Sequence, residues 1–145
     1  MRIQFLGICL VSTLCWLACG SMERAQASLP DYAPPVIFSS TVRMTSSDSR
    51  IQVMFAEQRG DFLVIDISYE GGCGEHDFQV VTKGDYTATY PPELKITLVH
   101  DRKADDCRSI IDEKRYFDLR PVQYSGTNKV LLVLTNTNKT LEYNY

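Results

Sequence analysis

Apolar side chains recur at every second position along much of this chain, and this alternation limits its fold more than any other feature. It is clearest where polar residues separate Leu94, Ile96 and Leu98. A period of two is typical of β-strands with one face in a core. Strand-like segments occupy residues 36–44, 51–55, 62–69, 78–81, 94–98, 130–134 and 141–145. We therefore predict an all-β fold, a small antiparallel β-sandwich of the immunoglobulin-like kind with about seven strands, or else a small barrel.

Local patterns refine this prediction. The tripeptide Arg59-Gly60-Asp61 between two alternating segments predicts a hairpin turn, and we interpret its match to the integrin-binding tripeptide as ordinary turn chemistry. The continuous apolar run 130–134 predicts a central strand buried on both faces. Residues 104–114 could form one or two helical turns, with Asp105 or Asp106 as the N-cap.

Tyrosines are frequent in the second half of the chain. One interpretation is an aromatic binding surface, and the other is half-buried packing with the hydroxyl groups in water. We favour the packing interpretation. The residues concerned are Tyr86, Tyr90, Tyr116, Tyr124, Tyr143 and Tyr145.

The N-terminus has the pattern of an export signal. One basic residue, Arg2, precedes an apolar run from Phe5 to Ala18, which is shorter than the ~20 residues that span a bilayer. Cleavage after Ala27 would define a signal peptide over residues 1–27. Alternatively, Leu17-Ala18-Cys19-Gly20 resembles a bacterial lipobox, so the signal would end at residue 18 and Cys19 would carry the lipid. We predict an exported protein of the cell envelope, either lipid-anchored or periplasmic, or alternatively secreted.

Beyond the signal, the sequence predicts one domain. Residues 28–35 contain three prolines and read as a linker, and residues 36–145 have the usual size of a single domain. The formal net charge is −3, which offers no basic field for nucleic acid. The expected partners are the membrane, through the possible lipid anchor, and an envelope protein or small ligand.

The cysteine count predicts one disulfide. The chain has five cysteines, of which Cys9 and Cys15 lie in the apolar run and Cys19 lies at its end. Cys73 and Cys107 remain, and an even remainder in an oxidising compartment predicts a disulfide. Closing their loop of about 34 residues would contribute ~3–4 kcal/mol through the unfolded state.

Each of these two cysteines has a histidine near it in the sequence. His76 follows Cys73, and His100 precedes Cys107. If the strands stay regular, Cys73 and His100 lie on core-facing sides at strand ends. The four side chains could therefore gather at one rim of the sandwich.

Several interpretations of this cluster stay open. The simplest is a structural disulfide with histidines that bond to nearby backbone groups. A second adds a ligand or metal site made by His76, His100 and acidic neighbours. A third is a zinc site of two cysteines and two histidines, and a fourth is a cysteine nucleophile with a histidine base. The acidic neighbours are Glu75, Asp77 and Asp101.

The motif Gly71-Gly72-Cys73-Gly74-Glu75-His76-Asp77-Phe78, followed by Leu98-Val99-His100-Asp101 and then Cys107, resembles a signature of uncharacterised bacterial exported proteins and lipoproteins. It is similar to the NigD-like family. That resemblance covers residues 62–119 and implies a cell-envelope β-sandwich, without catalytic residues.

The sequence supports two hypotheses of function. No motif of a serine hydrolase, a Walker loop, a dinucleotide-binding turn or a zinc protease occurs in the sequence, so we predict no catalytic residue. The first hypothesis is a non-enzymatic envelope module that binds a partner or has a structural role, without a cofactor. The alternative is a metal-binding protein or metal-dependent hydrolase that uses His76 and His100 with zinc or another divalent ion.

Overall fold

The computed structural model of the chain describes residues 28–41 and 50–145. The predicted signal segment 1–27, with Cys19 and both predicted cleavage points, lies outside the described residues. Residues 42–44 of the first predicted strand lie outside them as well. Within the described ranges, no helix is long and apolar enough to cross a membrane.

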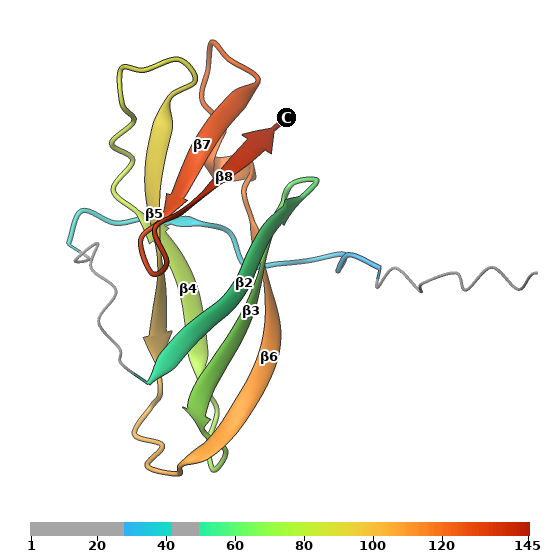
Figure 1. The fold of residues 1–145 in the computed structure, drawn as a ribbon, viewed down its shortest axis with the longest axis vertical. Coiled ribbons are helices and arrows are strands. Elements are labelled where there is room, and N and C mark those ends of the chain that lie inside the picture. The colour runs from blue at the N-terminus through green and yellow to red at the C-terminus, as the bar shows by residue number, and fades with distance from the viewer. Residues whose placement is uncertain (1–27, 42–49) are drawn as a thin grey trace, which may run out of the picture.

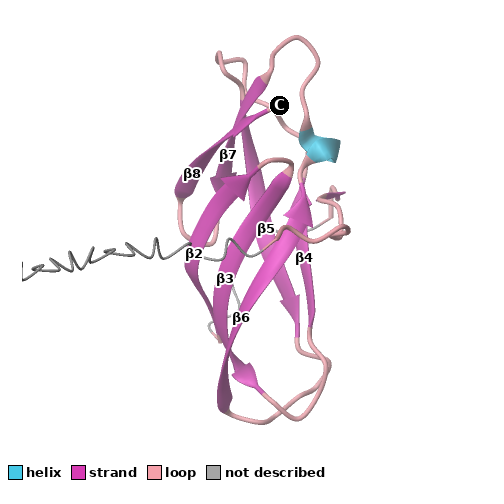
Figure 2. Ribbon diagram, turned by 90° about the vertical axis from the view of Figure 1, so that its right-hand side faces the viewer, coloured by secondary structure: helices cyan, strands magenta, loops and turns pink. Residues whose placement is uncertain are grey.

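The described residues form two β-sheets that enclose one core (Figures 1 and 2). One sheet has five strands in the order β1-β4-β5-β7-β8, and the other has three in the order β2-β3-β6. The predicted all-β sandwich is confirmed, with eight strands in place of about seven. Their bounds are β1 (Ile37–Phe38), β2 (Ile51–Arg59), β3 (Phe62–Gly71), β4 (Asp77–Thr82), β5 (Glu93–Asp101), β6 (Ser109–Asp118), β7 (Lys129–Leu134) and β8 (Lys139–Asn144).

Most neighbouring strands are antiparallel, and two pairs are parallel. Strand β1 runs parallel to β4, and β5 runs parallel to β7. The second case follows from the path of the chain. After β5 the chain crosses to the other sheet and runs back as β6, so β7 enters the first sheet in the same direction as β5.

The predicted hairpin is present between β2 and β3. Arg59 pairs with Phe62, and Gly60 has φ of +57° in the turn between them. A two-residue turn whose twist matches the strands needs positive φ at its first position, which glycine adopts without steric cost. A bulge between Val53 and Phe55 shifts the register of β2.

The core contains the alternating residues of the strands. Leu63, Ile65 and Ile67 from β3 are at most 1% exposed, and Leu94 and Ile96 from β5 are equally buried. Each fully buried leucine or isoleucine contributes roughly 1.5–3 kcal/mol of transfer free energy. The alternation seen in the sequence is therefore the main stabilising pattern of the sandwich.

Strand β7 differs from the prediction of burial on both faces. Val130, Leu132 and Leu134 point into the core and are completely buried, whereas Leu131 and Val133 are half-buried. The core cluster contains the three inward-facing residues of β7 and not the other two. The continuous apolar run therefore produced a strand with one buried face.

The prediction of helical turns over residues 104–114 is wrong. Residues 102–108 form a loop, and from Ser109 onward the chain is β6, which pairs with β3 along its whole length. Asp105 does not cap a helix, because the chain continues into β6; its carboxylate accepts the backbone N–H of Cys107 two residues later. This local bond favours a turn over a helix.

The predicted linker touches the sandwich where it reaches β6. Asp118 donates its N–H to the carbonyl of Pro34 at 2.9 Å, and Val36 donates to the carbonyl of Asp118 at 3.0 Å. Ala33 and Val36 are buried. The segment then crosses to the other sheet and pairs with β4 as β1.

Candidate functional site: the Cys/His end

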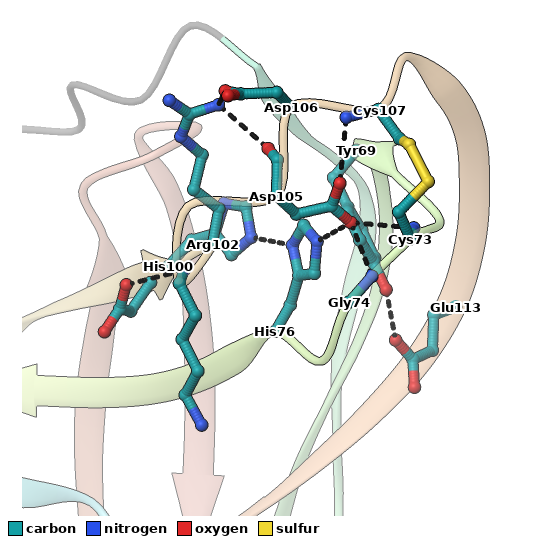
Figure 3. A network of polar contacts seen from close by, with 12 residues as sticks. Tyr69, Cys73, Gly74, His76, His100, Arg102, Asp105, Asp106, Cys107 and Glu113 are labelled. Carbon is teal, nitrogen blue, oxygen red and sulfur yellow. Dashed lines mark hydrogen bonds and ion pairs between the residues drawn. A yellow bond between two sulfur atoms is a disulfide. The ribbon is translucent and has the colours of Figure 1, made fainter.

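Two loops meet at one end of the sandwich and contain both cysteines and His76, while His100 lies near the end of β5 (Figure 3). The first joins β3 to β4 and carries Cys73 and His76, and the second joins β5 to β6 and carries Cys107. Cys73 and Cys107 form a disulfide with a Cα–Cα distance of 5.8 Å. We call this region, made of residues 71–78 and 100–108, the Cys/His end.

Asp105 lies at the centre of this end (Figure 3). Its carboxylate accepts the N–H groups of Cys73 and Gly74 at 2.9 Å and that of Cys107 at 2.8 Å. It also accepts a bond from Nε2 of His76 at 3.0 Å. Asp105 thus connects the same two loops as the disulfide, and does so through the backbone of both cysteines.

The electrostatics of Asp105 follow from these bonds. The carboxyl is buried, with 7% of the residue exposed. The hydrogen bond from His76, followed by those from the backbone of Cys107 and Cys73, holds the pKa of Asp105 well below its usual range. The group is therefore a fixed anion that organises N–H donors around itself.

The two histidines are in direct contact. Nδ1 of His76 lies 2.7 Å from Nε2 of His100. Because the Asp105 carboxylate can only accept, His76 donates through Nε2, and in the neutral pair its Nδ1 then accepts the Nε2–H of His100. The three residues form one chain of hydrogen bonds that leads from a fixed anion toward His100.

Aromatic rings surround this chain of bonds. The rings of Phe78 and His100 stack with centroids 4.7 Å apart, and Tyr69 lies 4.8 Å from the ring of His76. A Cβ atom on Gly71 would come within 2.6 Å of two atoms of His76. The glycine of the motif therefore allows the imidazole to pack directly on the backbone.

A second polar group lies beside the rings. Tyr69 donates its hydroxyl to Glu113 at 3.1 Å, and Arg115 donates to the same carboxylate at 2.9 Å. The guanidinium of Arg115 also lies over the ring of Phe78, at 4.7 Å from its centroid. Burial, followed by the charge of Glu113, raises the pKa of the Tyr69 hydroxyl.

The structure brings both cysteines and both histidines together, and Cys73 and Cys107 form the predicted disulfide. His100 pairs with Phe78 and faces inward. Cys73 is exposed, because β3 ends at Gly71 and the chain turns at Gly72, which has φ of +111°. Beyond this turn the side chains no longer alternate in step with those of β3, so Cys73 does not take the core-facing position that the alternation predicted.

The acidic neighbours do not join the histidines. Glu75, Asp77 and Asp101 are exposed, and Asp77 forms an ion pair with Lys103 at 2.7 Å. Sequence reasoning missed Asp105 as the organising residue. The one local signal for it was an aspartate two residues before a cysteine, a spacing that allows a side-chain bond back to the cysteine N–H.

The disulfide and the contact between the two histidines both constrain metal binding at this end. Carboxylate and sulfur atoms of Cys73, Asp105 and Cys107 lie within 4.8 Å of one another, but in the disulfide the sulfurs are not thiolates. Two imidazoles on a tetrahedral zinc ion, with Zn–N of ~2.0–2.1 Å, have their nitrogens roughly 3.3 Å apart. A metal between His76 and His100 would have to replace their hydrogen bond and move the rings apart.

The comparisons with known proteins identify solved structures with a similar fold. No family model matches the chain, and no curated protein matches it. A solved NigD-like immunity protein from Bacteroides caccae matches with a TM-score of 0.53 and 13% identity, over 77% of this chain and 58% of that one. A toxin-related protein from Parabacteroides distasonis matches with a TM-score of 0.49 and 14% identity, over 76% of this chain and 61% of that one.

This chain therefore spans less than two thirds of either solved protein. At such low identity, the likeness to the Bacteroides caccae protein shows a shared fold and nothing more. It confirms, at the level of the fold, the resemblance to NigD-like proteins that the cysteine and histidine motif indicated.

Proposed function

We propose that this chain is an exported cell-envelope protein whose disulfide-bonded β-sandwich acts as a binding or structural module, not as an enzyme. One observation carries the proposal: the polar groups at the Cys/His end are bonded to one another. Asp105 accepts four N–H donors, and both ring nitrogens of His76 are engaged. Such a network orders two loops, and it leaves His76 without a ring nitrogen for a substrate.

Two further observations support a location in the cell envelope. The predicted signal and the lipobox-like Cys19 support export, and a disulfide suits an oxidising compartment. A lipid on Cys19 would attach the sandwich to a membrane. One solved protein with this fold carries the name of an immunity protein, which fits a role that depends on binding.

Fractionation of the native host tests export and anchoring. We expect the wild-type chain in the membrane fraction, and we expect Cys19→Ala to leave that fraction because the acylated thiol is gone. Cys15→Ala is the matched control, since it removes a cysteine from the apolar run but keeps Cys19. An unprocessed wild-type chain in the cytoplasm would contradict the proposal.

Affinity capture tests the binding role. The processed protein, immobilised in its oxidised form, should enrich one envelope component over a reduced and unfolded sample of the same protein. His76→Ala and His100→Ala should retain that component if the histidines have a structural role. If several growth conditions yield no enriched component, the binding role is wrong.

A second candidate function is metal binding by His76 and His100, because their ring nitrogens face each other and an ion that replaced their hydrogen bond would have both as ligands. This candidate predicts a divalent ion in protein purified without chelators or tags, and loss of that ion in His76→Ala and in His100→Ala. Asp77→Asn is the matched control, because Asp77 is exposed and bonded to Lys103. A metal-free wild-type protein by elemental analysis would eliminate this candidate.

A further inference from the structure

The first described part of the chain crosses one side of the sandwich, from the three-stranded sheet to the five-stranded one. It lines a shallow groove with residues 113–117 of β6, and Ile37 then pairs with Val81 of β4. Figure 1 shows this segment, coloured blue to cyan, at about the middle of the long axis. We call residues 29–38 the N-terminal strap. The strap closes the side of the sandwich on which β6 and β1 are the edge strands.

The strap is attached through small or branched side chains and leaves its larger ones exposed. Ala33 is 5% exposed and Val36 is 3% exposed, so both are buried against the sandwich. The carbonyl of Pro34 between them accepts the N–H of Asp118 at 2.9 Å. The larger hydrophobic side chains are between 38% and 79% exposed, and they are Leu29, Tyr32, Ile37 and Phe38.

This exposure is concentrated to an unusual degree. In the described ranges, nine large hydrophobic side chains are exposed, and four of the nine lie within the ten residues of the strap. Single exposed hydrophobic residues are normal, whereas a group of them marks a site of contact with a protein or a membrane. The strap has one charged residue, Asp31, and no lysine or arginine. An apolar surface is therefore the partner that it suits.

We infer that the strap is a membrane-contacting surface, which places this side of the sandwich against the bilayer while the acyl chains on Cys19 hold the protein there. Leu29 is ten residues after Cys19, and ten residues of chain span at most roughly 35 Å. A lipid on Cys19 thus keeps the strap close to the membrane surface. The rings of Tyr32 and Phe38 suit the headgroup level, where aromatic side chains are enriched.

This inference rests on the lipid anchor of the proposed function and adds an orientation to it. Strands β6 and β1 are edge strands on the strap side, and β2 and β8 are edge strands on the opposite side. Because the strap crosses near the middle of the long axis (Figure 1), the sandwich would lie along the membrane on one side. The Cys/His end and the opposite end would both stay accessible to a partner.

Tryptophan fluorescence tests this orientation on the processed, full-length protein. The one tryptophan of the chain is Trp16, which lies in the predicted signal and is lost on processing. Tyr32→Trp therefore puts a single reporter in the strap, where the native side chain is 79% exposed. Met54→Trp is the matched control, since Met54 is 61% exposed and lies on β2, away from the strap.

Both variants are mixed with phosphatidylcholine vesicles, with and without bromine on the acyl chains. Brominated lipid should quench Tyr32→Trp about twofold, because interfacial side chains lie ~5–10 Å into the boundary of headgroups and acyl chains, and it should leave Met54→Trp unchanged. High salt should not alter the quenching, since the strap has no cation to pair with a phosphate. Phe38→Trp repeats the measurement at the other end of the strap, and thermal unfolding confirms that each variant folds.

Sedimentation of the vesicles separates failure of the inference from failure of the anchor. If the protein sediments with the vesicles but the reporters in the strap and on β2 are quenched equally, or not at all, the strap does not contact the membrane. That result overturns the inference, keeps the anchor, and leaves the strap to a protein partner or to solvent. If the protein does not sediment with the vesicles, the inference and the anchor both fail.

Discussion

The two ends of the sandwich are held together by different chemistry. At the Cys/His end, a covalent bond and one buried anion join two loops. At the opposite end, tyrosine hydroxyls perform that role. Tyr143 is completely buried, donates to Asp61 at 2.8 Å and accepts from Gln123 at 2.9 Å, while Tyr145 exchanges bonds with the backbone of Tyr124.

The comparison shows how each end satisfies buried polar groups. The opposite end, which we call the tyrosine end, contains Tyr143 and Tyr145. It uses neutral hydroxyls on side chains that are themselves part of the core or packed against it. The Cys/His end uses a charge that needs several donors to be stable when buried. This contrast also explains the Arg-Gly-Asp tripeptide, because Asp61 is bonded to Tyr143 and serves the fold. Tyr86, Tyr143 and Tyr145 pack in or against the core, as the packing interpretation states. Their hydroxyl groups do not lie in water as it expected, because they donate to Val122, Asp61 and Tyr124.

The largest expected effect is the loss of the disulfide. Replacing Cys73 and Cys107 together by serine should lower the free energy of unfolding by about 3–4 kcal/mol, because the closed loop spans 34 residues. Urea unfolding monitored by circular dichroism measures this. An effect below about 1 kcal/mol would mean that the unfolded chain is already compact without the disulfide, so that closing the loop removes little of its entropy.

The second-largest expected effect is the loss of stability on removal of the Asp105 carboxylate. Asp105→Ala should shift the urea midpoint clearly downward, since it removes the acceptor of four N–H donors, including the buried ring of His76. Asp106→Ala is the matched control: its side chain is 87% exposed and forms an ion pair with Arg102, so a change within about 0.5 kcal/mol is expected. Equal midpoints for the two variants would contradict the central place of Asp105.

A substitution at the tyrosine end should lower the free energy of unfolding by a smaller amount. Tyr143→Phe should cost about 1–2 kcal/mol, because Asp61 loses a buried donor while the ring stays packed. Tyr90→Phe provides the control, since Tyr90 is 84% exposed. If Tyr143→Phe matched that control, the hydroxyl network would not stabilise this end.

The smallest and most selective expected effect is a change in how the stability of the protein depends on pH. Asp105 has a lowered pKa, so its contribution is complete above its unfolded value of about 4 and is lost as the pH falls through the lowered value. Burial chiefly raises the pKa of Tyr143, so its contribution is complete below about 10 and is lost as the pH rises further. Asp105→Asn should flatten the stability curve only in acid, and Tyr143→Phe only in alkali.

The sequence was informative where structure is local. Alternation is a property of neighbouring residues, so it predicted β3, β5 and the β2–β3 hairpin, and the cysteine count predicted the disulfide. It could not show that β5 and β7 run parallel, because that pairing depends on the path of β6 through the other sheet.

The candidate site was predicted only in part, for the same physical reason. Proximity in sequence placed His76 near Cys73, and the register of β4 and β5 then brought His100 to the same end. The role of Asp105 depends on two loops that are far apart in sequence and close in space. A side chain with that role looks, in the sequence alone, like a helix cap or a solvated acid.

The most direct test of the account is the native intact mass of the processed protein from its own host, measured with and without reductant. If the Cys/His end is a closed structural network on an exported domain, the protein has a mass that begins at a lipidated Cys19 or at Ser28, gains two hydrogen atoms on reduction and contains no metal. A protein with both thiols free and a bound metal would contradict it, and would make the two histidines the place where this protein acts.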